Sequence, residues 1–160
     1  MSSTAKVSQE AAQSGSWLNL RTVSLILVVI GLAITGYLSY TKLTDTTTVC
    51  VESGAFNCDM VQHSIYSRLL GIPVAYLGFG AYVALIVLLA LETRVRFLAD
   101  FGAPLVFGIT LLGFLFSAWL TYVEFFLLQA LCPWCLASAV VMTLLFAVSI
   151  VRLRQNMAEG

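Results

Sequence analysis

Long apolar runs separated by short polar segments dominate the chain. Residues 22–41, 69–91 and 101–123 carry no charged side chain, and beyond Glu124 the next charged residue is Arg152. Each run is long enough for a transmembrane helix, which needs about 20 residues. The pattern therefore predicts a membrane protein built from several spanning helices.

The region 101–151 is too long to form one helix. At about 1.5 Å per residue it would measure about 76 Å, more than twice the roughly 30 Å hydrocarbon core of a bilayer. Its turn signal is "QALCP", at residues 129–133. We therefore predict an all-α membrane protein, a four-transmembrane-helix bundle over residues 20–154, with helices at about 21–41, 72–92, 102–128 and 133–152.

The segments outside the helices differ in character. Residues 1–19 are rich in Ser, Ala and Gln, and residues 155–160 are short and polar, so both are predicted to be tails, the first of them disordered. The loop 42–71 contains "NCDMVQHSIYSRLLG". Asn57 and Asp59 favour a helix start, so this loop is expected to carry a short amphipathic helix at the membrane interface.

Composition and charge fit this picture. Hydrophobic residues make up 60% of the chain and charged residues only 10%, against about 25% in soluble domains. A net charge of zero offers no basic field for nucleic acid. Six of the eight basic residues fall on one predicted face, which the positive-inside rule makes cytoplasmic. The chain is thus expected in the inner (plasma) membrane with both termini cytoplasmic and the loop 42–71 outside.

Four cysteines form two pairs, and both pairs fall on the predicted outer face, where disulfides persist. Cys132 precedes Pro133, so it lies at the start of the last helix, with Cys135 one turn inside. Helix N–H groups and the helix dipole there favour a thiolate, which is both nucleophile and leaving group. Cys135 is expected to point into the bundle, where an oxidant dissolved in lipid can reach it.

Cys50 and Cys58 lie instead in a polar loop with Gly54, which can flex. A mobile pair facing water and a fixed pair facing lipid suit an electron relay. Two other readings stay open. Both pairs could be inert disulfide links, or the four thiolates could bind zinc, although a C-x₇-C spacing departs from the usual C-x₂₋₄-C.

The order of these motifs resembles a known family. "C-x₇-C", a serine six residues later, "GIP" and a late "CPWC" are similar to the bacterial homologues of vitamin K epoxide reductase. The other bacterial type of membrane disulfide oxidase has its CxxC first, so the order here favours the vitamin K epoxide reductase family. The resemblance covers roughly residues 20–152.

The resemblance implies a bundle around a bound quinone, ubiquinone or menaquinone, with Cys135 beside it. It makes Cys50 and Cys58 a shuttle pair, Cys132 and Cys135 the active-site pair, and Ser64 a supporting residue. Many bacterial homologues carry a fused thioredoxin-like domain. Here the chain stops at residue 160, so a separate extracytoplasmic thioredoxin-fold thiol oxidase is expected to supply the electrons.

The function predicted is a membrane thiol:quinone oxidoreductase that reoxidises this partner and supports disulfide bond formation. The alternatives are a vitamin K epoxide or quinone reductase and a non-enzymatic disulfide-stapled scaffold. Ala139 stands where the animal enzymes have a tyrosine, which disfavours the epoxide. Glu124 is a candidate for proton transfer or for orienting the CxxC turn, unless it reaches the interface by snorkelling.

Overall fold

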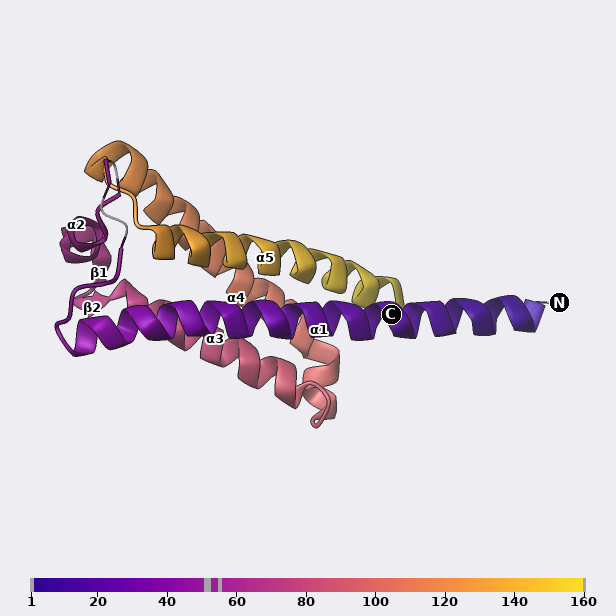
Figure 1. Ribbon diagram of the computed structural model, residues 1–160. Helices are drawn as coiled ribbons and strands as arrows, with labels where there is room; N and C mark the ends of the chain where they lie inside the picture. The colour runs from indigo at the N-terminus through magenta and orange to yellow at the C-terminus, as the bar shows by residue number, and fades with distance from the viewer. Residues whose placement is uncertain (1, 51–52, 55, 160) are drawn as a thin grey trace.

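A computed structural model describes residues 2–50, 53–54 and 56–159, with side chains described from Asn19 onward. Within these residues, four long helices form an all-α bundle, and each contains a segment long and apolar enough to cross a membrane (Figure 1). The predicted four-helix architecture is confirmed. The long helices are α1 (Ser2–Leu43), α3 (Val74–Leu91), α4 (Arg96–Val123) and α5 (Pro133–Glu159).

The described residues of both predicted tails are helical. Helix α1 begins at Ser2 and projects well past the rest of the bundle (Figure 1). Helix α5 likewise continues through residues 155–159. The physical reason is that adding residues to an existing helix avoids the costly nucleation step. The Ala, Gln, Glu, Lys and Arg residues of these segments tolerate that extension well.

The turn between the third and fourth spans lies where the sequence predicted it. Helix α4 starts at Arg96, six residues before the predicted start at 102, because its first turn is free to extend into the polar boundary. It is followed by a single π-helical turn, η2 (Glu124–Leu128). Gln129 then adopts the left-handed conformation with φ 47°, and Pro133 begins α5. The residues 129–132 thus reverse the chain between two spans.

Close contact between helices fixes the middle of the bundle. Gly31 on α1 faces the ring of Tyr82 on α3, and a Cβ at residue 31 would overlap that ring. The Tyr82 hydroxyl in turn donates a hydrogen bond to the Ser138 carbonyl on α5, at 3.1 Å. Small residues that let backbones approach are a common device in membrane bundles. Three helices therefore meet around the Tyr82 ring, within a core formed by Val28, Tyr82, Leu85, Leu89, Val106, Val141, Met142 and Leu145.

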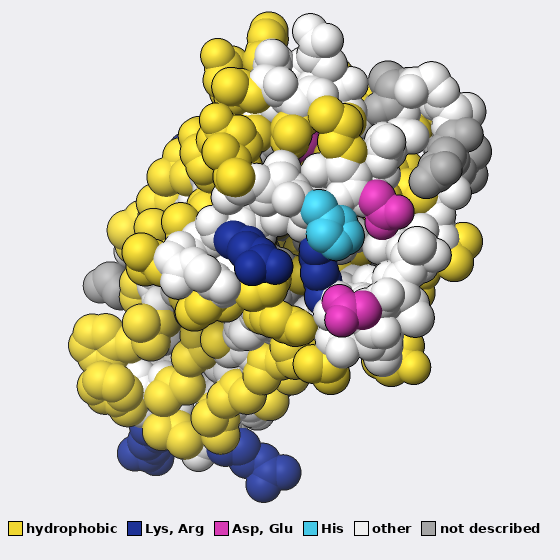
Figure 2. Space-filling view, turned by 90° about the vertical axis from the view of Figure 1, so that its left-hand side faces the viewer, with side chains coloured by type: hydrophobic (Ala, Val, Ile, Leu, Met, Phe, Trp, Pro, Cys, Tyr) yellow, Lys and Arg dark blue, Asp and Glu magenta, His cyan; other side chains and the backbone are white. Residues whose placement is uncertain are grey.

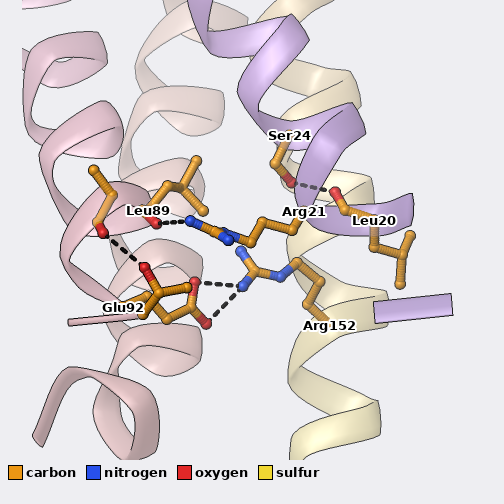
Figure 3. Close-up of polar contacts among 8 residues, drawn as sticks. Leu20, Arg21, Ser24, Leu89, Glu92 and Arg152 are labelled. Atoms are coloured by element: carbon orange, nitrogen blue, oxygen red, sulfur yellow. Dashed lines mark hydrogen bonds and ion pairs between the residues drawn. The ribbon is translucent and has the colours of Figure 1, made fainter. Parts of the chain in front are cut away.

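Charged side chains join the same three helices at the end of the bundle away from the cysteines (Figure 3). The Arg152 guanidinium on α5 donates to both carboxylate oxygens of Glu92, which follows α3, each at 2.7 Å. Arg152 is 1% exposed. Arg21 on α1 donates to the Leu89 carbonyl at 3.0 Å. Removing one partner of such a buried pair typically costs about 3–5 kcal/mol, so this end of the bundle is firmly held.

The segment 44–73, here called the cysteine loop, lies at the opposite end (Figure 1). The predicted short helix is present, and the Asn57 side chain caps it by accepting a hydrogen bond from the Met60 N–H at 3.0 Å. After this helix the chain makes a 3₁₀ turn and a tight antiparallel hairpin that leads into α3. The elements of the loop are α2 (Cys58–His63), η1 (Ile65–Ser67), β1 (Arg68–Leu69) and β2 (Ile72–Pro73).

Candidate functional site

All four cysteines meet at one end of the bundle. Cys50 and Cys58 form a disulfide, with their Cα atoms 6.3 Å apart, whereas Cys132 and Cys135 are free thiols. Cys58 and Cys132 are both fully buried and belong to one apolar cluster, against which Cys50 and Cys135 pack. The two pairs that the sequence separates by more than 70 residues therefore lie against each other.

Backbone contacts seat the cysteine loop on the CxxC turn. The Asn57 N–H donates to the Leu131 carbonyl at 3.1 Å, and Phe56 and Leu131 form a parallel β-bridge. These contacts lie directly before Cys58 and Cys132 in their respective segments. The bridge thus holds Cys58 beside Cys132.

A second set of contacts holds the Cys50 side of the loop. The Val49 N–H donates to the Tyr37 hydroxyl at 3.0 Å, and the Trp134 indole N–H donates to the Val49 carbonyl at 2.9 Å. The two rings lie 4.9 Å apart. Sequence reasoning missed Tyr37, because an aromatic residue near the end of a span is typical of an interface anchor. Here Tyr37 and Trp134 together position the residue before Cys50.

The two thiols of the CxxC are not equivalent. A hydrogen bond from the Cys135 side chain, helped by the backbone N–H groups of Cys135 and Trp134, lowers the pKa of the Cys132 thiol, which lies in the turn before α5. This is the effect expected at a helix start. A thiolate at Cys132 lies in the same buried cluster as the loop disulfide, so Cys132 is the member suited to exchange with the loop.

Glu124 supports the same turn from below. It is 4% exposed, and its Oε2 accepts a hydrogen bond from the Cys132 N–H at 3.2 Å. This burial rules out snorkelling to the interface. The single π-helical turn that begins at Glu124 is a feature that often marks functional sites. Glu124 is thus placed to orient Cys132, one of the two roles that the sequence left open.

A cavity of about 610 Å³ opens under the cysteine loop, between the helices. Of the four cysteines Cys135 alone lines it, and Glu124 and Ser64 line it as well. Ser64 also follows α2, where its hydroxyl donates to the Val61 carbonyl at 2.8 Å. The remaining wall is largely apolar, and includes Leu38, Val74, Leu77, Ala81, Leu112, Phe116, Leu120, Val123, Ala139 and Met142.

The size and lining of this cavity suit a small apolar ligand. Ligand pockets of about 300–1,000 Å³ with mostly apolar walls and a few placed polar groups bind small molecules.

A model of the vitamin K epoxide reductase family matches residues 22–150. The chain belongs to the vitamin K epoxide reductase family. The match spans all four membrane helices and all four cysteines, and the resemblance predicted from the motif order is confirmed.

Membership of the vitamin K epoxide reductase family makes the chain a multi-pass membrane oxidoreductase. The non-enzymatic scaffold is therefore set aside. The structure also shows that the two CxxC thiols have different surroundings: Cys132 faces the loop disulfide, while Cys135 faces the cavity.

Proposed function

We propose that this protein is a thiol:quinone oxidoreductase that passes electrons from an extracytoplasmic dithiol to a membrane quinone. The observation that carries the proposal is that the two CxxC thiols have different surroundings. Cys132 is buried against the loop disulfide, and Cys135 lines an apolar cavity. A relay between a protein dithiol and a lipid-soluble acceptor requires this separation of its two substrates.

The electron route starts at the loop. A thiolate of the reduced partner attacks Cys50, the partly exposed member of the loop disulfide, and the partner's second thiol then releases the oxidised partner, leaving Cys50 and Cys58 as thiols. The Cys58 thiolate, buried beside Cys132, attacks the Cys132 sulfur of the Cys132–Cys135 disulfide, and Cys135 leaves as a thiolate. Cys50 resolves the Cys58–Cys132 link, which restores the loop disulfide and leaves the CxxC reduced.

The final transfer restores the starting enzyme. Two electrons and two protons leave the CxxC dithiol, the Cys132–Cys135 disulfide forms, and quinone becomes quinol. The net reaction is partner dithiol plus quinone to partner disulfide plus quinol. Electron flow in this direction needs an acceptor more oxidising than the dithiol, a condition that ubiquinone or menaquinone would supply.

The partner we propose is a separate thioredoxin-fold thiol oxidase, and the membrane is the inner (plasma) membrane with both termini in the cytoplasm. Support comes from the charge bias of the loops and from the exposure of the cysteine loop. Figure 2 views the molecule from the loop end, where charged side chains gather around a hollow between apolar flanks. A water-soluble partner could dock on such a face.

Epoxide reduction is the weaker alternative. Ala139 lines the cavity one turn beyond Cys135, at the position where the animal enzymes have a tyrosine. This wall therefore offers a methyl group in place of a phenol, and nothing at residue 139 can donate a proton to an epoxide oxygen.

The test uses purified protein, a reduced thioredoxin-fold dithiol oxidase, and short-chain ubiquinone and menaquinone analogues. We expect loss of quinone absorbance matched one for one by oxidation of the partner dithiol. Vitamin K epoxide is included as a third acceptor, with no turnover expected. Absence of reduction of every quinone, with the partner shown to be reduced at the start, would overturn the proposal.

Glu124 gives a sharper prediction because two substitutions separate its two possible roles. Glu124→Gln keeps an oxygen that can accept the Cys132 N–H, and Glu124→Ala removes it. Leaving the buried Cys132 N–H without a partner costs about 1–3 kcal/mol, so the Ala variant is expected to lose about 5- to 100-fold in quinone reduction, whereas Gln, which still accepts this hydrogen bond, retains most of it. Equal loss in both variants would instead indicate that the carboxyl group transfers a proton.

A further inference from the structure

The charge distribution in the cavity wall is uneven. Among the described residues that line it, Lys42 and Glu124 are the only two with formally charged side chains, and Lys42 is the only cation. Glu124 accepts a hydrogen bond from the Cys132 N–H. Lys42 therefore provides the one positive group that a bound molecule would meet.

The Lys42 ammonium is held in place rather than free in solvent. Lys42 lies in the last turn of α1, is half-buried, and donates to the Gln62 carbonyl on α2 at 2.6 Å. The same carbonyl accepts a hydrogen bond from the Ser67 hydroxyl at 2.5 Å, and the Gln62 amide donates to Thr48 at 2.9 Å. This network fixes the ammonium where α1 meets the cysteine loop.

Lys42 shares the cavity with the reacting sulfur, since Lys42 and Cys135 both line its wall. The charged residues near Lys42, namely Arg68, Asp59 and Asp45, belong to the cysteine loop. The ammonium has three N–H donors, and one of them is used by Gln62. It can therefore offer a further hydrogen bond toward the cavity.

We propose that Lys42 is a catalytic residue for the acceptor half of the reaction: its ammonium donates a hydrogen bond to a carbonyl oxygen of the quinone and stabilises the negative charge that collects there as electrons leave Cys135. This inference rests on the proposed function. Two electrons and two protons still pass from the CxxC dithiol to the quinone, and Lys42 is neither oxidised nor reduced.

The apolar wall of the cavity is the reason why a positive group there can stabilise charge on the quinone oxygen. Charge that develops on an oxygen in a water-poor site is strongly stabilised by a fixed positive group, because the effective dielectric constant is low and no solvent has to reorganise. Glu124, an acid, would oppose that charge if ionised. The Tyr82 hydroxyl, also in the wall, already donates to Ser138. Lys42 is the one cation among the described residues of the wall.

The decisive variant is Lys42→Gln, because its amide N–H can still donate to the Gln62 carbonyl while the positive charge is lost. Arg68→Met is the matched control, since Arg68 is a cation of the same loop region that does not line the cavity. Dithiothreitol serves as reductant, and a short-chain ubiquinone analogue as acceptor. Removal of one hydrogen-bond donor that stabilises negative charge on an oxygen in the transition state typically lowers kcat by about 10²–10³-fold.

We expect Lys42→Gln to lose at least about tenfold in kcat/KM for the quinone, with Lys42→Arg recovering much of the loss. Reduction of the Cys132–Cys135 disulfide by dithiothreitol, followed by thiol alkylation and mass spectrometry, should match wild type. Binding of the quinone analogue, measured by quenching of tryptophan fluorescence, should weaken in Lys42→Gln and stay unchanged in Arg68→Met.

Three outcomes would overturn the inference. If wild type reduces quinone and Lys42→Gln equals Arg68→Met in both turnover and binding, Lys42 has no such role and the proposed function stands. If Lys42→Arg is as inactive as Lys42→Gln, positive charge is not what matters. If wild type reduces no quinone, both the inference and the proposed function fail.

Discussion

Replacing Cys135 with serine is expected to reduce quinone turnover to the uncatalysed background while leaving the bundle folded. Cys135 is the thiol that lines the cavity, and it makes no disulfide in the structure. Serine is similar in size but cannot form a disulfide, so the electrons have no exit. The same loss is expected for Cys132→Ser, which removes the exchange partner of the loop.

The two variants should differ in what they accumulate. In Cys135→Ser the Cys132 thiolate survives beside the loop disulfide, so we expect a trapped Cys58–Cys132 link, visible by mass spectrometry of peptides alkylated before digestion. Cys132→Ser should not form that link. Ala137→Ser, on the same helix and outside the cavity wall, is the control. Near wild-type turnover of either cysteine variant would refute the assigned electron route.

Removing the loop pair is expected to separate the two halves of the reaction. In Cys50→Ala and Cys58→Ala, dithiothreitol should still support quinone reduction, because a small dithiol can reach the CxxC through the cavity at the partly exposed Cys135. A thioredoxin-fold protein is too large for that route, so its oxidation should fall to background. The measurement is quinone absorbance with each reductant in turn.

This comparison also tests whether the loop disulfide serves folding alone. Circular dichroism and thermal unfolding of both variants supply the control. Equal loss of turnover with the small and the large reductant, together with a lowered melting temperature, would show that the Cys50–Cys58 pair is structural.

The local features of the fold could be predicted from the sequence because local rules decide them. Pro133 starts α5, as its fixed backbone angle favours, and Asn57 caps α2 through its own side chain. The helical tails could not be foreseen in this way. Residues 2–19 have no apolar period of their own, and their helix depends on the span that follows.

The sequence was enough to predict the cysteines of the candidate site, but not the residues that surround them. Four cysteines on one face follow from spacing and charge bias. Tyr37 and Lys42, by contrast, act through contacts between α1 and a loop segment whose position only the folded chain fixes. In the sequence, a lysine at the end of a span indicates topology, and a tyrosine there indicates an interface anchor. Neither signal points to a redox site.

The ion pair between Glu92 and Arg152 bears on how a lipid-soluble molecule reaches the cavity. Arg152 and Arg21 tie α5 and α1 to the end of α3, far from the sulfur atoms. At the other end no such ion pair between helices is among the described contacts, and the helices are joined through the cysteine loop, by hydrogen bonds such as those of Val49 and Gln62. The helices are thus held together more firmly at the ion-pair end than at the cysteine end. We therefore expect them to separate near the cysteine loop and to admit the acceptor laterally from the adjacent leaflet.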